Sequence, residues 1–414
     1  MRIFCAIRHS QDSIFFYGDL WSKNFYPALE QLGCQMIEST VDLLPASQFM
    51  QIAGNFTLLE LEVRAQITQK IIDEVRQHHQ KEPIDLFLSY FYNAHFDPDG
   101  FEIIHRLGIP TVNFYCNSIY QFDLVSEIAA KVNFSWHPEK AARSLYLSIG
   151  ANPVWIQMGA NPAVYYPIEG EPKQARACFV GQRYADRDRF LAALLSQQIP
   201  VDIYGSGWGY SFSQQTPADT QTLKPQLQDS QWSEYLGRRF PKPGSLNSYA
   251  QVIWNNLRTQ GFIRGSHRTC KQIAYRYHSQ KLTPLLVSAA CGFAESLSQT
   301  FAHYEVVLNF SHVWADGYPG ALLIPHVRLR DFEAPMCRTC YLTGYSEEIA
   351  EFYELGREVD TYCSVDELID RVQFYLNHPS DAEKLRQAGY QRAIHNHTWK
   401  HRFAQLFQAI DLKV

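Results

Sequence analysis

The segment Ala177–Gly205, ACFVGQRYADRDRFLAALLSQQIPVDIYG, decides the fold class. The apolar runs at 177–180 and 201–204 are typical of buried β-strands, and residues 186–198 between them repeat apolar side chains with a helical period. A strand, a helix and a second strand in this order form a βαβ unit, in which the two strands are parallel. We therefore predict a parallel sheet covered by helices in this part of the chain.

The same alternation of strands and helices runs through the amino-terminal part of the chain. Apolar runs at 3–7 and 34–38 flank a helix-period segment at 20–32. The alternation continues from Ile84 to Met158, with one of its helices predicted at 122–130. In the carboxyl-terminal part, after the βαβ unit at 177–204, later strands are predicted at 306–310, 339–342 and 358–362, and a helix is predicted at 365–377. The sequence thus predicts an α/β protein with two doubly wound domains.

Composition indicates where the domains meet. Residues 166–175, YPIEGEPKQA, are polar and contain Pro and Gly, as is typical of a linker. We assign residues 1–168 to a first Rossmann-like domain and 175–395 to a second one, with an insertion of unassigned structure at about 211–260. Residues 396–414 are predicted to form a final helix whose apolar face packs on another part of the chain.

Composition and charge exclude several classes of protein. With 46% hydrophobic and 19% charged residues, the 414-residue chain is globular and not disordered. A net charge of -5 argues against a broad nucleic-acid surface, so no nucleic-acid partner is expected. No apolar run reaches the length of about 20 residues that spans a bilayer, and the first residues show no signal-peptide pattern. We expect a cytoplasmic protein without a transmembrane segment.

The cysteines and the acidic pairs give no reason to expect a metal. Nine Cys without framework spacing suit a reducing compartment. Cys337 and Cys340 form a C-x-x-C pair without a second cluster, so we expect two buried thiols. Asp97 and Asp99 form a D-x-D pattern, but its place before a predicted helix suits capping better than metal binding.

Residues that follow strands are the first candidates for a binding site, because ligands of doubly wound sheets bind beyond the carboxyl ends of the strands. Gly181, Arg183 and Arg187 lie between the first strand of the opening segment and its helix, where free N–H groups and guanidinium groups favour a phosphate. Gly205 and Trp208 belong to a glycine-rich turn after the next strand. A solvated loop and a tight turn without a ligand are the alternative interpretations.

The segment RLRDFEAP, residues 328–335, combines cations with carboxylates at the start of a helix. Pro335 is expected only in the first turn of a helix, so this helix is predicted to begin near Asp331 as its N-cap. Arg328 and Arg330 could hold a pyrophosphate there, and Glu333 could accept hydrogen bonds from ribose hydroxyl groups. A surface ion pair between Arg330 and Glu333 is the alternative interpretation.

An ordered series of short motifs resembles the carboxyl-terminal half of the CgeB-like glycosyltransferases of the GT-B superfamily. The resemblance covers about residues 177–407 and is looser in the amino-terminal half, as at Gly108-Ile109-Pro110. The motifs that carry it are Phe179-Val180-Gly181, Ile203-Tyr204-Gly205, Val307-Leu308-Asn309-Phe310-Ser311, Arg330-Asp331-Phe332-Glu333-Ala334, Tyr341-Leu342-Thr343, Gly356-Arg357-Glu358-Val359 and His397-Thr398-Trp399.

The resemblance implies a GT-B fold, in which two Rossmann-like domains face each other across a cleft and the final helix crosses back to the amino-terminal domain. It implies an enzyme that transfers a hexosyl or related sugar from a UDP-, GDP- or dTDP-sugar to an unknown glycan, protein or small-molecule acceptor. A non-catalytic nucleotide-sugar or glycan-binding protein and a GT-B-fold sugar-nucleotide epimerase are the alternatives.

The resemblance also implies roles for particular residues. Glu333 would contact the ribose, Ser311 would belong to the donor site, and Arg183, Arg328 and Arg330 would hold the diphosphate. No metal and no other cofactor is then required, because the guanidinium groups neutralise the leaving group.

The catalytic base is expected in a loop of the first domain. His9 follows the first predicted strand and Asp97 follows a later one, and either side chain can deprotonate an acceptor hydroxyl. Many GT-B enzymes carry a second carboxylate eight residues before the ribose-binding Glu, where this chain has Pro325. The stereochemical outcome therefore cannot be predicted.

Overall fold

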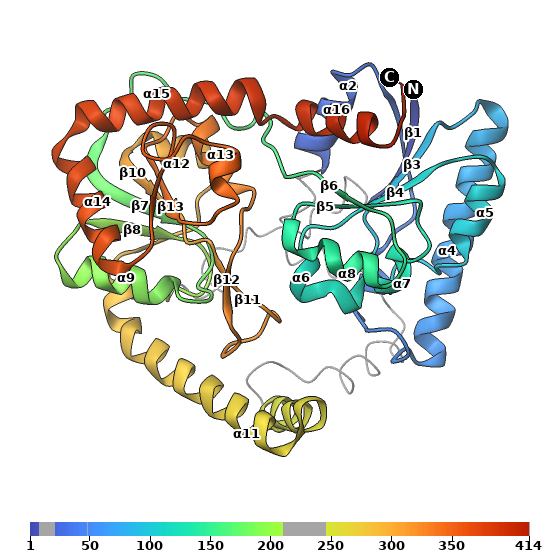
Figure 1. The fold of residues 1–414 in the computed structure, drawn as a ribbon, viewed down its shortest axis with the longest axis horizontal. Coiled ribbons are helices and arrows are strands. Elements are labelled where there is room, and N and C mark those ends of the chain that lie inside the picture. Colours follow the sequence, from blue (N-terminus) through green and yellow to red (C-terminus); the bar gives the residue numbers. More distant parts are fainter. Residues whose placement is uncertain (8–20, 48, 210–245, 414) are drawn as a thin grey trace, which may run out of the picture. The chain divides into compact units, whose positions relative to one another are not determined.

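The computed structural model describes residues 1–7, 21–47, 49–209 and 246–413, which fall into two compact units (Figure 1). The first unit comprises the described residues of Met1–Met158 and Trp399–Val414, and the second those of Gly159–Pro217 and Lys242–Thr398. The segment 166–175, predicted as a linker, is grouped with the second unit. Each unit contains a six-stranded parallel sheet, which confirms the predicted α/β class with two doubly wound domains.

The first sheet has the strand order β2-β1-β3-β4-β5-β6. The chain adds β2 on one side of β1 and the later strands on the other, so the direction of winding reverses between β1 and β3. The strands are β1 (Arg2–Ala6), β2 (Gln35–Glu38), β3 (Leu86–Ser89), β4 (Thr111–Phe114), β5 (Phe134–His137) and β6 (Pro153–Trp155).

Helical segments pack against the first sheet. The long helix α4 (Leu58–Lys81) starts with a capping box of Thr57 and Glu60, and its apolar stripe packs with Phe87 of β3 and the helix α5 (Gly100–Arg106). The remaining helical segments of the first unit are η1 (Trp21–Phe25), α2 (Tyr26–Glu30), α3 (Leu44–Ser47), α6 (Ser118–Gln121), η2 (Phe122–Leu124), α7 (Ser126–Ala129), η3 (Lys140–Ala142), α8 (Arg143–Ser148) and α16 (Trp399–Ala409).

The final helix, α16, packs on the first unit through an aromatic cluster. The ring of Phe25 lies 4.5 Å from that of Trp399 and 5.1 Å from that of Phe403, and Trp136 of β5 lies 5.4 Å from Phe403. Nε of Arg402 donates to the carbonyl of Met158 at 2.8 Å. The predicted return of the last helix to the amino-terminal domain is therefore confirmed, and its apolar face has the predicted role.

Two predicted helices of the first unit are broken. The segment 20–32 forms, within its described residues, a π-helical turn followed by α2, which has Pro27 in its first turn, where the missing proline N–H costs nothing. The segment 122–130 divides into η2 and α7. The amide side chain of Asn93 explains this break, because it donates to the carbonyl of Asp123 and accepts from the backbone N–H of Glu127.

The second sheet has the strand order β14-β13-β10-β7-β8-β9, so its winding reverses between β7 and β10. A separate two-stranded antiparallel sheet joins β11 (His312–Trp314) to β12 (Leu323–Pro325). The strands of the large sheet are β7 (Gln174–Val180), β8 (Val201–Tyr204), β9 (Ala290–Gly292), β10 (Tyr304–Leu308), β13 (Tyr341–Gly344) and β14 (Asp360–Tyr362).

Helices cover both faces of the second sheet. Leu191 and Leu194 of α9 (Arg187–Ser196) and Val372 of α14 (Val365–Asn377) share a core with Phe179 and Leu342 of the sheet. The other helices are α11 (Leu246–Val287), α12 (Leu297–Ala302), α13 (Arg330–Met336), η6 (Ile349–Glu351) and α15 (Pro379–Asn396). The sequence patterns did not predict β9, α11, α12 or the β11–β12 pair.

The start of α13 differs from its prediction. The helix begins at Arg330 with Leu329 at the N-cap, and Pro335 lies in the second turn of the seven-residue helix, not in the first. Asp331 still closes the start of the helix, because its Oδ2 accepts the backbone N–H of Arg328 at 2.7 Å.

Candidate functional site

The carboxyl edge of the second sheet is the natural place for a ligand, because the winding reverses there between β7 and β10. Gly181 follows β7, Gly205 follows β8, and Ser311 lies shortly after β10. Arg187 begins α9, and Arg328 and Arg330 lie at the start of α13.

The two glycine turns at this edge pack on each other. Gly205 has φ +123, and a Cβ there would lie 2.4 Å from the carbonyl oxygen of Gly181. Trp208 is 1% exposed, and its Nε1 donates to the same carbonyl at 2.7 Å. Gly205 and Trp208 therefore shape the turn and fill the core, so the geometry favours the interpretation as a tight turn for these two predicted donor residues.

Arg183 is held by protein groups. Its Nη1 donates to the hydroxyl of Thr283 at 2.9 Å, its Nη2 reaches the carbonyl of Ser279, and Asp188 lies 3.4 Å away. The guanidinium also lies over the ring of Trp208. These contacts attach α11 to the loop after β7. The Nε of Arg183 is buried without a hydrogen-bond partner among the described residues, and its contact with a diphosphate stays a prediction.

Arg187, Arg328 and Arg330 form a cationic group. Burial and the neighbouring charges of Arg328 and Arg330 lower the pKa of Arg187 to about 10. The Nη1 of Arg187 donates to the carbonyl of Gln182 at 3.0 Å, and Nε of Arg328 donates to Nδ1 of His326 at 3.0 Å. Nε of Arg187 and Nη2 of Arg328 are buried and have no hydrogen-bond partner among the described residues.

Asp331 ties this group to the sheet. Its carboxylate is buried, and its Oδ1 accepts from Tyr341 at 2.9 Å, from Thr343 at 3.1 Å and from Asn309 at 3.3 Å. Burial raises the pKa of Asp331, and the hydrogen bonds from its partners oppose that rise. The network fixes the start of α13 to the carboxyl ends of β10 and β13, so the two arginines beside it are positioned by rigid elements.

Glu333 lies in α13 and is 7% exposed. Its Oε2 lies 2.9 Å from Nη1 of Arg330, and it interacts with the hydroxyl of Tyr165, whose pKa is raised by burial and by this carboxylate. The ion pair that the sequence suggested as an alternative is therefore formed, although it is largely buried and not a solvated surface pair. Its role toward a ribose stays a prediction.

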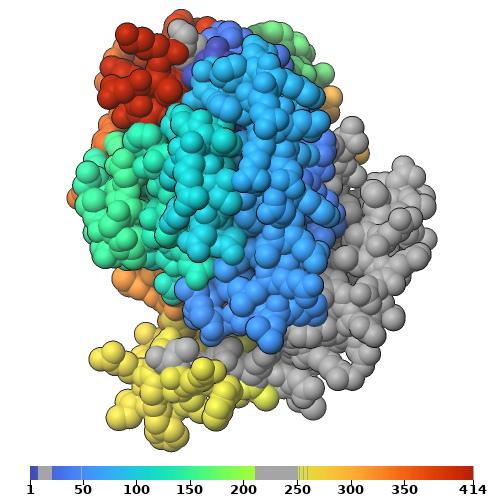
Figure 2. Space-filling view, turned by 90° about the vertical axis from the view of Figure 1, so that its right-hand side faces the viewer, coloured from blue at the N-terminus to red at the C-terminus, as the bar shows by residue number. Residues whose placement is uncertain are grey.

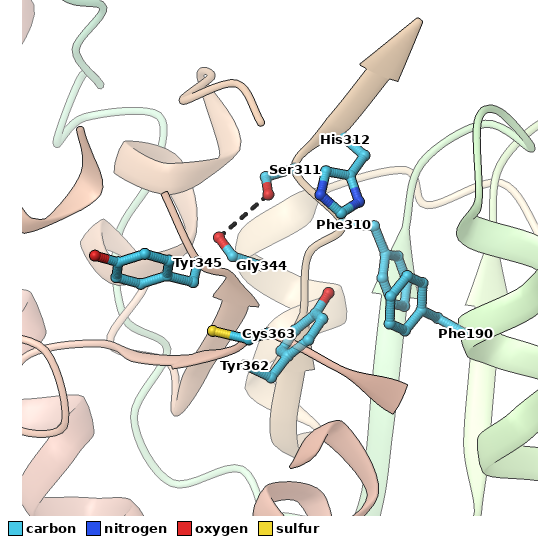
Figure 3. A pocket seen from close by; sticks show the side chains of 8 residues that line it. All are labelled: Phe190, Phe310, Ser311, His312, Gly344, Tyr345, Tyr362 and Cys363. Carbon is cyan, nitrogen blue, oxygen red and sulfur yellow. Dashed lines mark hydrogen bonds between the residues drawn. The ribbon is translucent and has the colours of Figure 1, made fainter. Parts of the chain in front are cut away.

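A pocket of about 220 Å³ opens at the same edge (Figure 3). Its lining side chains come from α9 and from the segments around the carboxyl ends of three strands, β10, β13 and β14. They are Phe190, Phe310, Ser311, His312, Gly344, Tyr345, Tyr362 and Cys363. Of the predicted donor residues, Ser311 lines this pocket, and its hydroxyl donates to the carbonyl of Gly344 at 3.1 Å.

His312 is a site residue that the sequence patterns missed. Its Nδ1 lies 2.7 Å from Oδ2 of Asp186, and this hydrogen bond raises the pKa of His312. A histidine in the pocket that is readily protonated can donate a hydrogen bond to an anion. The position of His312 after β10 could have marked it as a candidate site residue. Its partner Asp186 could not be found in this way, because it is 126 residues away in the chain.

The candidates for the catalytic base lie in the first unit. His9 is outside the described residues. Asp97 precedes α5, where its Oδ1 accepts the backbone N–H of Asp99 at 3.1 Å, so the structure shows it in the turn before the helix. Neither assignment is tested, and both stay predictions.

The metal-ligating residue types are dispersed in the described part of the chain. Cys337 and Cys340 are buried thiols, as predicted, with 6% and 0% exposure. Among the described residues, no group of three or more His, Cys, Asp or Glu side chains is arranged to hold a metal ion. In that same part of the chain, every helix is too short or too polar to cross a bilayer.

Comparison with known proteins agrees with this architecture. Residues 271–408 match the family described as glycosyl transferase-like. Anabaena HepE, solved in complex with UDP, has 12% sequence identity and a TM-score of 0.53, with 99% of this chain and 100% of that chain covered. Sucrose-phosphate synthase from Thermosynechococcus elongatus has 12% identity and a TM-score of 0.54, with 99% of each chain covered. A search of curated proteins found no significant match.

The likeness to the solved structures extends over both sheets and shows a shared fold. The matched domain contains β10, α13 and the strand ends that line the pocket. The CgeB-like resemblance is not tested by these matches. Residues 271–408 thus form a glycosyl transferase-like domain, and the whole chain has the fold of Anabaena HepE and of sucrose-phosphate synthase.

Proposed function

We propose that the protein uses a nucleoside diphosphate sugar, with UDP as the nucleotide, and holds its diphosphate beside Arg187, Arg328 and Arg330. The sugar passes to a hydroxyl-bearing acceptor, and no metal takes part. We further propose that the chain belongs to the CgeB-like glycosyltransferases, whose motifs its sequence resembles.

One observation carries the proposal: two buried guanidinium donors, Nε of Arg187 and Nη2 of Arg328, have no hydrogen-bond partner in the described residues. A buried donor without a partner costs about 1–3 kcal/mol, and more when it is charged. Burial and, after it, the neighbouring charges of Arg328 and Arg330 lower the pKa of Arg187, so both disfavour its charged form. A diphosphate would supply both the missing acceptors and the missing negative charge.

The chemistry follows from these charges. When the bond between the anomeric carbon and the diphosphate breaks, negative charge develops on the leaving phosphate. Cations held by rigid elements stabilise that charge without rearrangement. His312, whose pKa is raised by Asp186, lines the pocket at the same edge of the sheet, and its protonated ring can donate a further hydrogen bond to an anion. Arg330 is kept in position by Glu333, which lies in the same short helix.

Support for UDP comes from a protein of the same fold. Structures of Anabaena HepE were solved with UDP, with UDP and glucose, and with UDP-glucose. The sequence identity is only 10–12%, so the uracil preference rests on analogy. Binding measurements can therefore separate the diphosphate contact, which the arginines carry, from the choice of base.

The experiment titrates UDP, GDP and dTDP into the wild-type protein and into Arg328→Ala, and follows sugar release from the matching nucleotide sugars. We expect UDP to bind most tightly, and Arg328→Ala to weaken all three nucleotides by about tenfold or more. Arg357→Ala is the matched control, because this exposed arginine of the same unit pairs with Glu354. Unchanged nucleotide affinity in Arg328→Ala would overturn the diphosphate assignment.

A further inference from the structure

The helix α11 is a bent helical hairpin that the nucleotide site does not use. The backbone leaves helical geometry at Gly261, with φ 75° and ψ 171°, so Leu246–Val287 is two helices joined at a bend. The two arms pack closely, because a Cβ on Gly265 would lie 2.5 Å from the carbonyl oxygen of Asn256. The amide of Asn256 also donates to Thr269 and Gln272 on the other arm, at 3.1 Å each.

The hairpin is attached firmly to the second unit. Nη2 of Arg268 lies 2.8 Å from both carboxylate oxygens of Asp316, which follows β11. The ring of Tyr275 packs edge-on against that of Trp314, 5.4 Å away. In Figure 1 the labelled part of α11 lies away from the large sheet of this unit.

The bend carries large apolar side chains in contact with solvent. Phe262 is 79% exposed and Ile263 is 83% exposed, and both directly follow Gly261. Trp254 on the first arm is 64% exposed. Figure 2 shows the surface of this hairpin in yellow. Large apolar side chains that are exposed next to each other, as Phe262 and Ile263 are, mark interaction sites on protein surfaces.

The charge of the hairpin is one-sided. Residues 246–287 contain six Lys and Arg and no Asp or Glu, in a chain whose net charge is -5. The exposed Arg258 and Arg264 flank the apolar bend. Lys271 and Lys281 continue the positive charge along the second arm. A surface that combines exposed apolar side chains with flanking cations matches an anionic lipid bilayer.

We propose that the tip of α11 docks on a membrane surface that contains anionic phospholipids. Phe262 and Ile263 enter the boundary between headgroups and acyl chains, and Arg258 and Arg264 contact the phosphates. Phe262 lies six residues before the attachment at Arg268, which is about 9 Å along a helix. That reach is comparable to the depth of about 5–10 Å at which amphipathic helices lie.

The length and polarity of the hairpin suit surface binding and not a span. No helix in the described residues has the length and hydropathy that crossing a bilayer requires. The docked enzyme would have access to acceptors at a membrane surface, while the donor comes from solution. The inference is independent of the nucleotide site, because none of its residues belongs to that site.

The test is co-sedimentation of the full chain with two kinds of vesicle, phosphatidylcholine alone and phosphatidylcholine mixed with phosphatidylglycerol. We expect binding only to the anionic vesicles, and weaker binding at high salt. The pair Arg258→Gln and Arg264→Gln should lower the partition coefficient about 25-fold, at about fivefold for each charge. The pair Phe262→Ser and Ile263→Ser should lower it by about tenfold or more.

Leu58→Ser is the matched control, because Leu58 is 87% exposed but lies in α4 of the first unit. It should bind vesicles as the wild type does. Melting temperature and UDP affinity are measured for every variant, and if the apolar pair unfolds, the arginine pair decides the test.

Several results would overturn the proposal. The first is that the wild type does not bind the anionic vesicles. The second is that folded tip variants bind them as well as the wild type does. The third is that Leu58→Ser loses as much vesicle binding as the tip variants. A dimer in sedimentation velocity that Phe262→Ser and Ile263→Ser dissociate would show a second copy as the partner instead. RNA retention that the arginine variants abolish, with vesicle binding unchanged, would identify a nucleic acid.

Discussion

The carboxyl edges of the two sheets have the same architecture and opposite chemistry. At the first edge, Tyr90 and Tyr92 follow β3 with their hydroxyls 3.1 Å apart, and Tyr92 donates to Gln121 at 2.8 Å. At the second edge, arginines and a histidine surround the strand ends, among them Arg187 and His312. Both sheets reverse their winding beside the first strand of the unit, at β1 and at β7.

The difference teaches that the fold fixes where a ligand binds and that the loops fix which ligand it is. The hydroxyl and amide groups of Tyr90, Tyr92 and Gln121 suit a hydroxyl-bearing molecule, and the buried cations of the second edge suit a diphosphate. We therefore expect the nucleotide at the second edge and the acceptor at the first. The predictions below test this contrast.

The largest effect is expected from removing the cations of the second edge. Arg328→Ala combined with Arg330→Ala should weaken UDP binding by about 100-fold or more, because each charge-assisted hydrogen bond contributes about 1.5–3 kcal/mol. Isothermal titration calorimetry measures this, with Arg357→Ala as control. A loss of less than threefold would show that the cationic edge does not hold the diphosphate.

The next effect concerns the glycine turns that shape the second edge. Gly205→Ala should lower the free energy of unfolding by about 2–3 kcal/mol, because the new methyl group would meet the carbonyl of Gly181 and φ is positive. Gly356→Ala is the control, since Gly356 has φ +77 but open space around it, and it should cost about 1 kcal/mol. Urea denaturation compares the two, and equal losses would contradict the packing role of Gly205.

A smaller effect should appear in the pH dependence. Asp186 raises the pKa of His312 in the folded protein above its usual value of 6.5, so the pair stabilises the protein most fully below that pH. This contribution is lost as the pH rises through the raised pKa. Thermal melting across this range should show a decline that is absent in Asp186→Asn. Identical melting profiles for the wild type and Asp186→Asn would show that the pair of Asp186 and His312 does not stabilise the folded protein.

The smallest effect is expected from the first edge. Tyr92→Phe removes a hydrogen bond to Gln121 and should lower the free energy of unfolding by about 0.5–1.5 kcal/mol. It should leave UDP affinity unchanged within about twofold, since the neutral hydroxyl of Tyr92 contributes no charge-assisted bond to a phosphate. A large loss of UDP affinity in Tyr92→Phe would show that the nucleotide binds at the first edge and not at the second.

Periodicity was sufficient to predict the two parallel sheets, because their buried strands and amphipathic helices leave clear patterns. The segments 177–180 and 201–204 lie in β7 and β8, and the prediction for α14 agrees with the structure at both ends. The prediction failed where tertiary contacts decide local structure. Asn93 breaks the segment 122–130 from a distant loop, and no local pattern marks the bend at Gly261.

The candidate site was predictable in part for the same reason. Arg187, Arg328 and Arg330 were found because they follow strands or begin helices, and the structure places them close together. Arg183 and Trp208 fit the same pattern, but the partners that hold them, such as Thr283, come from distant parts of the chain. His312 was missed because its significance depends on Asp186. Contacts between distant segments are what a single sequence does not show.

The most direct test of the central claim compares the binding of UDP and UMP to the wild type and to the variant Arg328→Ala with Arg330→Ala. The account predicts that the wild type prefers UDP over UMP by about tenfold or more, because the β-phosphate gains charge-assisted hydrogen bonds, and that the variant loses this preference. A variant that keeps the wild-type ratio of UDP to UMP affinity would show that these arginines do not contact the β-phosphate, and would contradict the account.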